Sequence, residues 1–291
     1  MKLKTAAFLV GIVALGAGCP PENNLTPFIS GSIAVTAGDF DDVQLPFNRL
    51  VVNTQAYEGL ISSATWDDEY NPANNALKVE DLLGDGNDIT EHQLVIIASG
   101  TRGLGKRQYN GLEPDDAFIG DANALSRVKA KVIGQGIIMM TDWAYDLAEQ
   151  TWPDFVDYLG DDTEFDAAQT GEIGTVTAAI TDDRLAAALG TDTVAIRYDF
   201  SNWAVMEAVD EDNVTVWLRG DVSYRVRDGE GAETLTDVPL LVSYQPEGPD
   251  KGTVVVATFH LDAQTPQVTD EILRVVVGNF EEQSHEPVDP L

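Results

Sequence analysis

Short apolar segments alternate along this chain with amphipathic ones, which predicts strands that alternate with helices. Leu94–Ser99 (LVIIAS) is a continuous apolar run, as in strands that are buried on both faces of a parallel sheet. Ala122–Val132 is amphipathic at helical spacing, with Asp121 placed to cap its start and Gly134 placed to end it. Val214–Val226 alternates between apolar and polar residues, which indicates a strand.

The rest of the pattern continues this alternation. The apolar strand Ile137–Met140 runs into a predicted helix at Ala144–Gln150, and Gly174–Gly190 predicts a strand followed by a short helix. The alternation predicts a three-layer α/β fold with extra strands in the second half of the chain. The other predicted elements are strands at Gly31–Asp39 and Val194–Phe200, a hairpin of Pro239–Gln245 and Gly252–His260, and a closing helix at Asp270–Phe280.

A different pattern precedes the predicted fold. Lys2 and Lys4 are followed by an uncharged, mostly apolar run over Thr5–Leu15, which is typical of a secretory signal peptide. The run is shorter than the about 20 residues of a transmembrane helix. The stretch Leu15–Cys19 (LGAGC) resembles a bacterial lipobox with Gly16 in the usual leucine position, so lipid on the cysteine is expected. The alternative is an ordinary cleaved signal with an incidental cysteine.

These features divide the chain into four predicted parts. Residues 1–18 form a lipoprotein signal peptide and residues 19–30 a polar, proline-rich tether. Residues 31–280 form the α/β domain, and residues 281–291 form a polar tail. Lipid on Cys19 is the predicted contact with the membrane. We therefore expect an extracytoplasmic protein of the bacterial cell envelope, at the outer rather than the inner membrane.

Charge and cysteine content exclude several functions. The formal net charge of −32 at pH 7 leaves no basic face for phosphates, which excludes nucleic acid as a partner. Cys19 is the only cysteine, so the chain forms no internal disulfide. A lipidated Cys19 also leaves no thiol for metal ligation or nucleophilic attack. The acidity suits either a saline medium or a surface that collects divalent cations.

Three features that can carry chemistry follow predicted strands. Asp142 follows Ile137–Met140, and the glycine-rich loop Gly100–Gly105 (GTRGLG) follows an earlier strand. The third feature is Phe259–Asp262 (FHLD), at the end of the last apolar strand. Ligand sites of open α/β sheets gather at the carboxyl ends of strands, so we expect these three features to lie together.

In this order the features resemble the class I glutamine amidotransferase-like fold, and within it the cysteine-free proteins similar to trehalose-utilisation-type domains. The resemblance covers roughly Gly31–Phe280 and implies a mostly parallel, flavodoxin-like sheet. It implies that Gly100–Gly105 is the loop that supplies oxyanion donors, and that the elbow for a nucleophile falls at Thr141–Trp143. In such proteins the last strand ends in a Phe-His-x-acid motif, matched here by Phe259–Asp262.

This chain departs from the glutaminases of that fold at the elbow, because no cysteine lies there. Glutaminase chemistry needs a thiolate that a neighbouring histidine activates, so this activity is excluded. The leading hypothesis is a degenerate, noncatalytic domain that acts as a binding or structural module. Its pocket would be the rim of the old active site, with Gly100, Gly103, Thr141 and Trp143 as candidate lining residues.

Two other uses of the same residues stay open. A hydrolase, for example one that acts on carbohydrate, could use His260 as a general base oriented by Asp142 or Asp262. The same three side chains could hold a divalent cation such as Ca²⁺ or Mg²⁺, and no other cofactor is expected. A purely structural alternative is that Asp142 caps the helix that starts at Ala144 and His260 is an ordinary hydrogen-bonded residue.

Weaker candidates have structural explanations that are favoured over functional ones. Asp81–Glu91 is slightly similar to a calcium loop but lacks the regular acidic spacing, so an acidic loop is expected. The tryptophans Trp143, Trp152, Trp203 and Trp217 are expected in the core or at its edge, with a sugar-stacking platform as the alternative.

Overall fold

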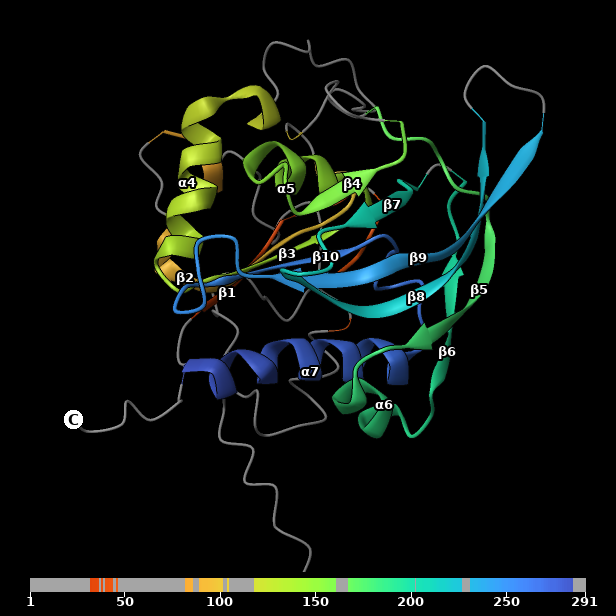
Figure 1. The fold of residues 1–291 in the computed structure, drawn as a ribbon. Helices are drawn as coiled ribbons and strands as arrows, with labels where there is room; N and C mark the ends of the chain where they lie inside the picture. Colours follow the sequence, from red (N-terminus) through yellow and green to blue (C-terminus); the bar gives the residue numbers. More distant parts are fainter. Residues whose placement is uncertain are drawn as a thin grey trace, which may run out of the picture.

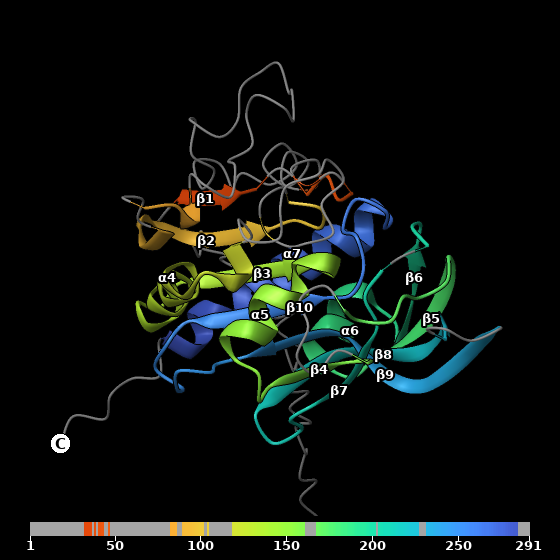
Figure 2. The same ribbon diagram turned by 90° about the horizontal axis from the view of Figure 1, so that it is seen from above.

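The computed structural model contains an eight-stranded sheet and a separate two-stranded one (Figure 1). The structure describes residues 32–36, 38, 40–43, 46, 82–85, 89–101, 104, 118–160, 167–201, 203–226 and 231–284. The large sheet has the spatial order β1-β2-β3-β10-β9-β8-β5-β6, and Figure 2 shows it from above. Its strands are β1 (Ser32–Val35), β2 (His92–Ile97), β3 (Ile137–Thr141), β5 (Gly174–Ile180), β6 (Thr193–Tyr198), β8 (Val214–Arg225), β9 (Ala232–Tyr244) and β10 (Thr253–Ala257).

The large sheet is mixed, because a parallel half and an antiparallel half join at β10. Strands β1, β2, β3 and β10 pair in parallel. The pairings of β10 with β9, β9 with β8, β8 with β5 and β5 with β6 are all antiparallel. The predicted parallel sheet therefore accounts for four strands, and the extra strands predicted for the second half of the chain form the antiparallel extension.

Helices cover both faces of the large sheet: α4 and α5 lie on one face, and α6 and α7 on the other (Figure 1). Strand β2 shows why both faces are apolar. Val95 and Ile97 belong to the core on the side of α4 and α5, whereas Leu94 and Ile96 belong to the core on the side of α7. The helices are α4 (Ala122–Ile133), α5 (Tyr145–Thr151), α6 (Asp183–Leu189) and α7 (Pro266–Ser284), with short 3₁₀ turns η2 (Ile89–Glu91), η4 (Phe118–Gly120) and η5 (Asp142–Ala144).

Helix α4 confirms the predicted start and stop signals. The Asp121 carboxylate accepts a hydrogen bond from the Asn123 amide at 2.8 Å, which caps the first turn. Gly134 follows the last helical residue, and its amide donates to the carbonyl of Ala130 at 2.9 Å. The left-handed residue that usually ends a helix is here Gln135, with φ of 66°, rather than the glycine.

Other elements are longer than predicted or were not predicted. Strand β9 begins at Ala232 and forms with β8 a long hairpin that projects from the body of the molecule (Figure 1). Its first residues are mostly exposed and carry no apolar signal. Helix α7 runs from Pro266 to Ser284, so it extends into the predicted tail. The small sheet pairs β4 (Val156–Tyr158) with β7 (Met206–Val209), strands too short to show a period.

Several predicted features lie outside the described residues. These are the signal peptide and tether at residues 1–30 with Cys19, the loop residue Gly103, and residues 285–291 of the tail. Among the helices that the structure describes, none is both long and apolar enough to cross a bilayer.

Candidate functional site

The residue after β3 has an unusual backbone. Asp142 opens the η5 turn that leads into α5, and its φ is 43°, in the left-handed region that few residues other than glycine adopt. A backbone of this kind typically costs about 1–3 kcal/mol and persists where the surroundings hold it. The side chain is fully buried. The turn between Thr141 and α5 is therefore a sharp strand-to-helix elbow with an inward-pointing carboxylate.

The Asp142 carboxylate is fully engaged by other parts of the chain. Its Oδ2 atom accepts a hydrogen bond from Ser99 Oγ at 3.1 Å and lies 3.1 Å from Nε2 of His260. Its Oδ1 atom accepts from the Ala204 amide at 2.7 Å. The proposal that Asp142 caps its own helix is wrong, because α5 begins without a side-chain cap and the carboxylate points to these partners instead.

Both ring nitrogens of His260 face carboxylates. While Nε2 faces Asp142, Nδ1 lies 3.1 Å from Oδ1 of Asp199. Burial alone would lower the pKa of His260, but the hydrogen bonds to the two carboxylates outweigh it and raise the pKa to about 11. The hydrogen bond from His260 in turn lowers the pKa of Asp199. The ring therefore bridges two carboxylates, one fully buried and one partly exposed.

A reciprocal clasp holds the segment that follows His260. The buried Asp41 carboxylate accepts hydrogen bonds from the amides of Leu261 and Asp262, at 3.1 and 3.2 Å. The Asp262 carboxylate accepts in return from the Asp42 amide at 3.1 Å. Burial raises the pKa of Asp41 to about 7. The clasp ties the chain after β1 to the chain after β10 at the carboxyl end of the parallel strands.

The other predicted rim residues lie around this centre in different roles. Thr141 is fully buried, and its hydroxyl accepts a hydrogen bond from the Ser99 amide at 3.0 Å. Gly100 has a φ of 77° and begins the loop directly after Ser99. Trp143 is half-buried, with its ring 5.8 Å from that of Tyr145. Thr141 thus connects the ends of β2 and β3. Of the described rim residues, only Gly100 and Trp143 are partly exposed.

His260 is covered on its ring face. Phe200 lies against it with ring centroids 6.3 Å apart, and Phe40 stacks on Phe200 at 4.8 Å. The exposed fraction of His260 is 4%. A hollow of about 140 Å³ beside the ring does not admit a water-sized sphere; its lining residues are Tyr198, Asp199, Phe200, Trp203, Phe259 and His260. Substrate and attacking water therefore have no room in this hollow.

A set of possible metal ligands differs from the predicted one. One donor atom each from Asp199, His260 and Asp262 lie within 4.8 Å of one another. Asp142 is not in this set, since it occupies the opposite nitrogen of the ring. The side chain of Asp199 is 35% exposed, and Asp262 is exposed as well. The group therefore faces solvent, in contrast to the buried Asp142 side.

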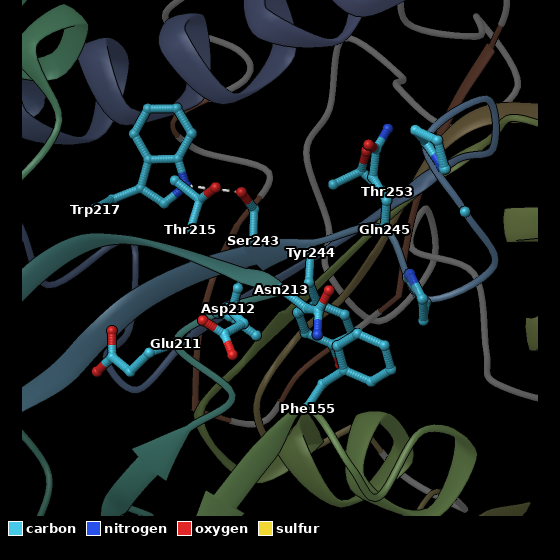
Figure 3. Close-up of a pocket in the computed structure, with 14 residues that line it drawn as sticks. Phe155, Glu211, Asp212, Asn213, Thr215, Trp217, Ser243, Tyr244, Gln245 and Thr253 are labelled. Carbon is cyan, nitrogen blue, oxygen red and sulfur yellow. Dashed lines mark hydrogen bonds between the residues drawn. The ribbon is translucent and has the colours of Figure 1, made fainter.

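A separate open groove of about 690 Å³ lies where β8 begins, β9 ends and β10 begins (Figure 3). The Trp217 indole donates to Ser243 Oγ at 2.9 Å, and the ring of Phe155 stacks on that of Tyr244 at 4.9 Å. Trp217 is only 2% exposed and Arg184 lies over its ring. Trp152 and Trp203 are buried too, so these tryptophans are core residues rather than a sugar-stacking platform.

Sequence reasoning missed Asp199, Asp41 and Ser99. Asp199 directly follows β6, and Ser99 lies two residues beyond β2, so the rule that sites gather at strand ends could have found both. The loop residue Asp41 offers no such signal, because its role depends on a contact with residues 220 positions away.

No protein-family profile and no curated protein matches the chain. Solved structures similar to it include a GMP synthase component from Thermoplasma acidophilum, with 9% identity, a TM-score of 0.46, and coverage of 87% of this chain and 94% of that one. A ThuA-like protein from Bacteroides uniformis has 10% identity and a TM-score of 0.45 over 91% and 95% of the two chains. A GH42 β-galactosidase from G. stearothermophilus has 12% identity and a TM-score of 0.37 over 67% of this chain and 22% of that one. At TM-scores under 0.5, these similarities assign neither a fold family nor an activity.

Proposed function

We propose that this protein is a noncatalytic binding or structural module of the bacterial cell envelope, built on a degenerate amidotransferase-like domain with flavodoxin-like layering. The proposal that the module is noncatalytic rests on the hydrogen-bond partners of His260. Each of its ring nitrogens faces a carboxylate at 3.1 Å, so neither nitrogen is free to take a proton from an attacking water. The residue at the elbow, Asp142, is fully buried and serves as one of those partners.

The surroundings of the elbow support the same conclusion. Ser99 and the Ala204 amide also donate hydrogen bonds to Asp142, so both of its carboxylate oxygens are engaged within the protein. Catalytic side chains need contact with a substrate, whereas the Asp142 side chain is fully buried. The arrangement is that of an internal ion pair, and removing one member of such a pair typically costs about 3–5 kcal/mol. The elbow thus contributes stability in place of chemistry.

The experiment compares stability with activity in the same variants. Asp142→Asn and His260→Gln are unfolded in urea beside wild type, and all three are assayed against a panel of esters, amides and glycosides. We expect both variants to unfold at lower urea concentration and wild type to show no turnover above buffer. Asp212→Asn, at an exposed loop position, is the matched control and should leave the midpoint unchanged. Turnover by wild type that folded His260→Gln lacks would establish a hydrolase instead.

The envelope location depends on Cys19. The apolar run and the lipobox-like LGAGC stretch support cleavage after residue 18 and attachment of lipid, with residues 19–30 as the tether and residues 31–280 as the domain. Cells that express wild type or Cys19→Ser are labelled with a fatty-acid analogue and fractionated. Wild type should carry label and sediment with outer membranes, and the variant should do neither. Equal membrane association of the unlabelled variant would remove the anchor from the proposal.

A further inference from the structure

We propose that Asp199, His260 and Asp262 form a binding site for a divalent transition-metal cation at the solvent-facing rim of the elbow. This inference rests on the proposed binding role of that rim and names its ligand. The three donors come from two segments: Asp199 directly follows β6, and His260 and Asp262 lie in the turn that follows β10. Their donor atoms lie within 4.8 Å of one another, close enough for one ion to contact all three after small rotations of the carboxylates.

The second observation is the carboxylate behind the ring. A histidine that binds a metal usually gives its other ring nitrogen to a carboxylate, which fixes the tautomer and the orientation of the ring. Asp142 holds Nε2 in this way at 3.1 Å, and it is itself fixed by Ser99 and the Ala204 amide. Its hydrogen bond leaves Nδ1 as the nitrogen that faces Asp199. The buried Asp142 therefore orients the His260 ring so that Nδ1 faces the more exposed Asp199.

The local charge also favours a cation. Four carboxylates lie around the single imidazole: two face its nitrogens, and Asp41 and Asp262 meet in the adjacent clasp. Even a protonated ring leaves this group negative. A divalent ion between Asp199, His260 and Asp262 would offset that excess at the point where the group is open to solvent. The hydrogen on Nδ1 would leave to solvent as the metal–nitrogen bond forms.

The donor set selects the class of ion. Imidazole nitrogen is a good ligand for Zn²⁺ and its first-row neighbours, whereas Ca²⁺ and Mg²⁺ prefer oxygen ligands alone. One nitrogen and two carboxylates suit Zn²⁺ or Mn²⁺, with water in the remaining positions. Asp199 and Asp262 are both exposed enough for the ion to reach the site from solvent.

The test is a calorimetric titration of the full-length protein, purified in detergent, with Zn²⁺ and separately with Mn²⁺. Asp199→Asn and Asp262→Asn each remove one ligand, and Asp212→Asn removes an exposed carboxylate from the loop before β8. A salt concentration near 0.15 M screens diffuse binding to the acidic surface. We expect wild type to bind one ion per chain. Both ligand variants should bind it with an affinity lowered by more than about 10–100-fold, because the loss of a residue that only supports a metal ligand already costs that much. Asp212→Asn should bind as wild type does.

Three results would overturn the site. They are absence of stoichiometric binding of either ion to wild type, unchanged affinity in both ligand variants, or an equal loss in Asp212→Asn. Circular dichroism of each variant checks that the fold is kept. The stability of Asp142→Asn tests the structural role of the elbow without metal. Failure of the metal site is therefore distinguishable from failure of the proposed function.

Discussion

Nε2 of His260 lies 3.1 Å from Oδ2 of Asp142, although 118 positions separate the two residues in the sequence. The two residues follow β10 and β3, which are neighbouring parallel strands. The contact therefore joins the ends of two central strands from inside the protein. The sharp turn after β3 thus carries one half of a buried ion pair.

A double-mutant cycle measures the strength of this contact. Asp142→Asn and His260→Gln should each lower the free energy of unfolding, and the double variant should lose less than the sum of the two. Contacting residues typically show coupling of about 0.5–3 kcal/mol. We expect a value in the upper part of that range, because both side chains are buried and charged partners. Urea unfolding of the four proteins gives the coupling directly, and strictly additive losses would contradict the pairing.

A glycine at the opposite end of β10 should be intolerant of any side chain. A Cβ atom on Gly252 would collide with the backbone of Gly136, its carbonyl oxygen above all, and the Gly252 amide donates to the Val132 carbonyl at 2.7 Å. Gly252→Ala would therefore push the start of β10 away from the turn after α4. Overpacking typically costs about 1–3 kcal/mol, and we expect the free energy of unfolding to fall by at least that much. Thermal unfolding measures the change.

Gly174 supplies the matched control for this substitution. It begins β5, has nothing within 4 Å of an added Cβ, and does not have a positive φ. Gly174→Ala should be neutral or stabilise by about 0.4–1 kcal/mol through the unfolded chain. A similar loss of stability in both variants would show that close approach at Gly252 is not the cause.

The sequence predicted the parallel half of the sheet well, because its signals are local. Runs such as Leu94–Ser99 are apolar throughout, since strands like β2 are buried on both faces. Caps such as Asp121 mark helix ends by their own chemistry. The first part of β9 escaped prediction because its exposed residues pair mainly through backbone with β8. Pairing through the backbone does not depend on the side chains, so it produces no recognisable pattern of apolar and polar residues.

The candidate site was predictable only in its strand-end residues. Asp142 and His260 stand out because each follows an apolar strand, and the structure brings them into contact. Asp262, expected beside them, has a donor atom within 4.8 Å of one of His260, and its carboxylate also accepts a hydrogen bond from the Asp42 amide. The partners Asp199 and Asp41 depend on how β6 and the loop after β1 approach the parallel strands. That approach is set by tertiary packing, which no local pattern encodes.

The exposed edge of β6 is closed by side chains, and opening it should promote self-association. Gln264 accepts a hydrogen bond from the Arg197 amide at 2.9 Å and donates to the Arg197 carbonyl at 2.8 Å, as a neighbouring strand would. The Thr191 hydroxyl makes the same pair of contacts with Thr193. Unpaired strand edges are templates for another chain, so such covers prevent pairing.

Gln264→Leu removes this cover while keeping a side chain of similar length. We expect the variant to lose about 1–3 kcal/mol, because backbone groups lose their partners. It should also form dimers at lower protein concentration than wild type does, as measured by light scattering after size exclusion. Adding Thr191→Val should increase association further. A Gln264→Leu protein with the stability and mass distribution of wild type would show that the edge needs no cover.

The cap of α6 should give a pH-dependent contribution to stability. Asp182 accepts a hydrogen bond from the Arg184 amide at 2.9 Å and pairs with the Arg184 guanidinium at 2.8 Å. Burial alone would raise the pKa of Asp182, but these hydrogen bonds outweigh it and lower the pKa below the usual 3.8. A lowered pKa means that the contribution is present above pH 3.8 and is lost as the pH falls through the folded-state value.

Replacing this cap should therefore matter at neutral pH and less in acid. Asp182→Ala should lower the free energy of unfolding by about 1 kcal/mol at pH 7, the usual cost of losing an N-cap. The difference from wild type should shrink as the pH falls below 3.8, because the wild-type carboxylate then gains a proton and weakens its hold on Arg184. Asp182→Asn keeps an acceptor without the charge, so its difference from Asp182→Ala should not change with pH. Urea unfolding at several pH values measures both differences, and a gap between wild type and Asp182→Ala that widens in acid would contradict the assigned role of the charge.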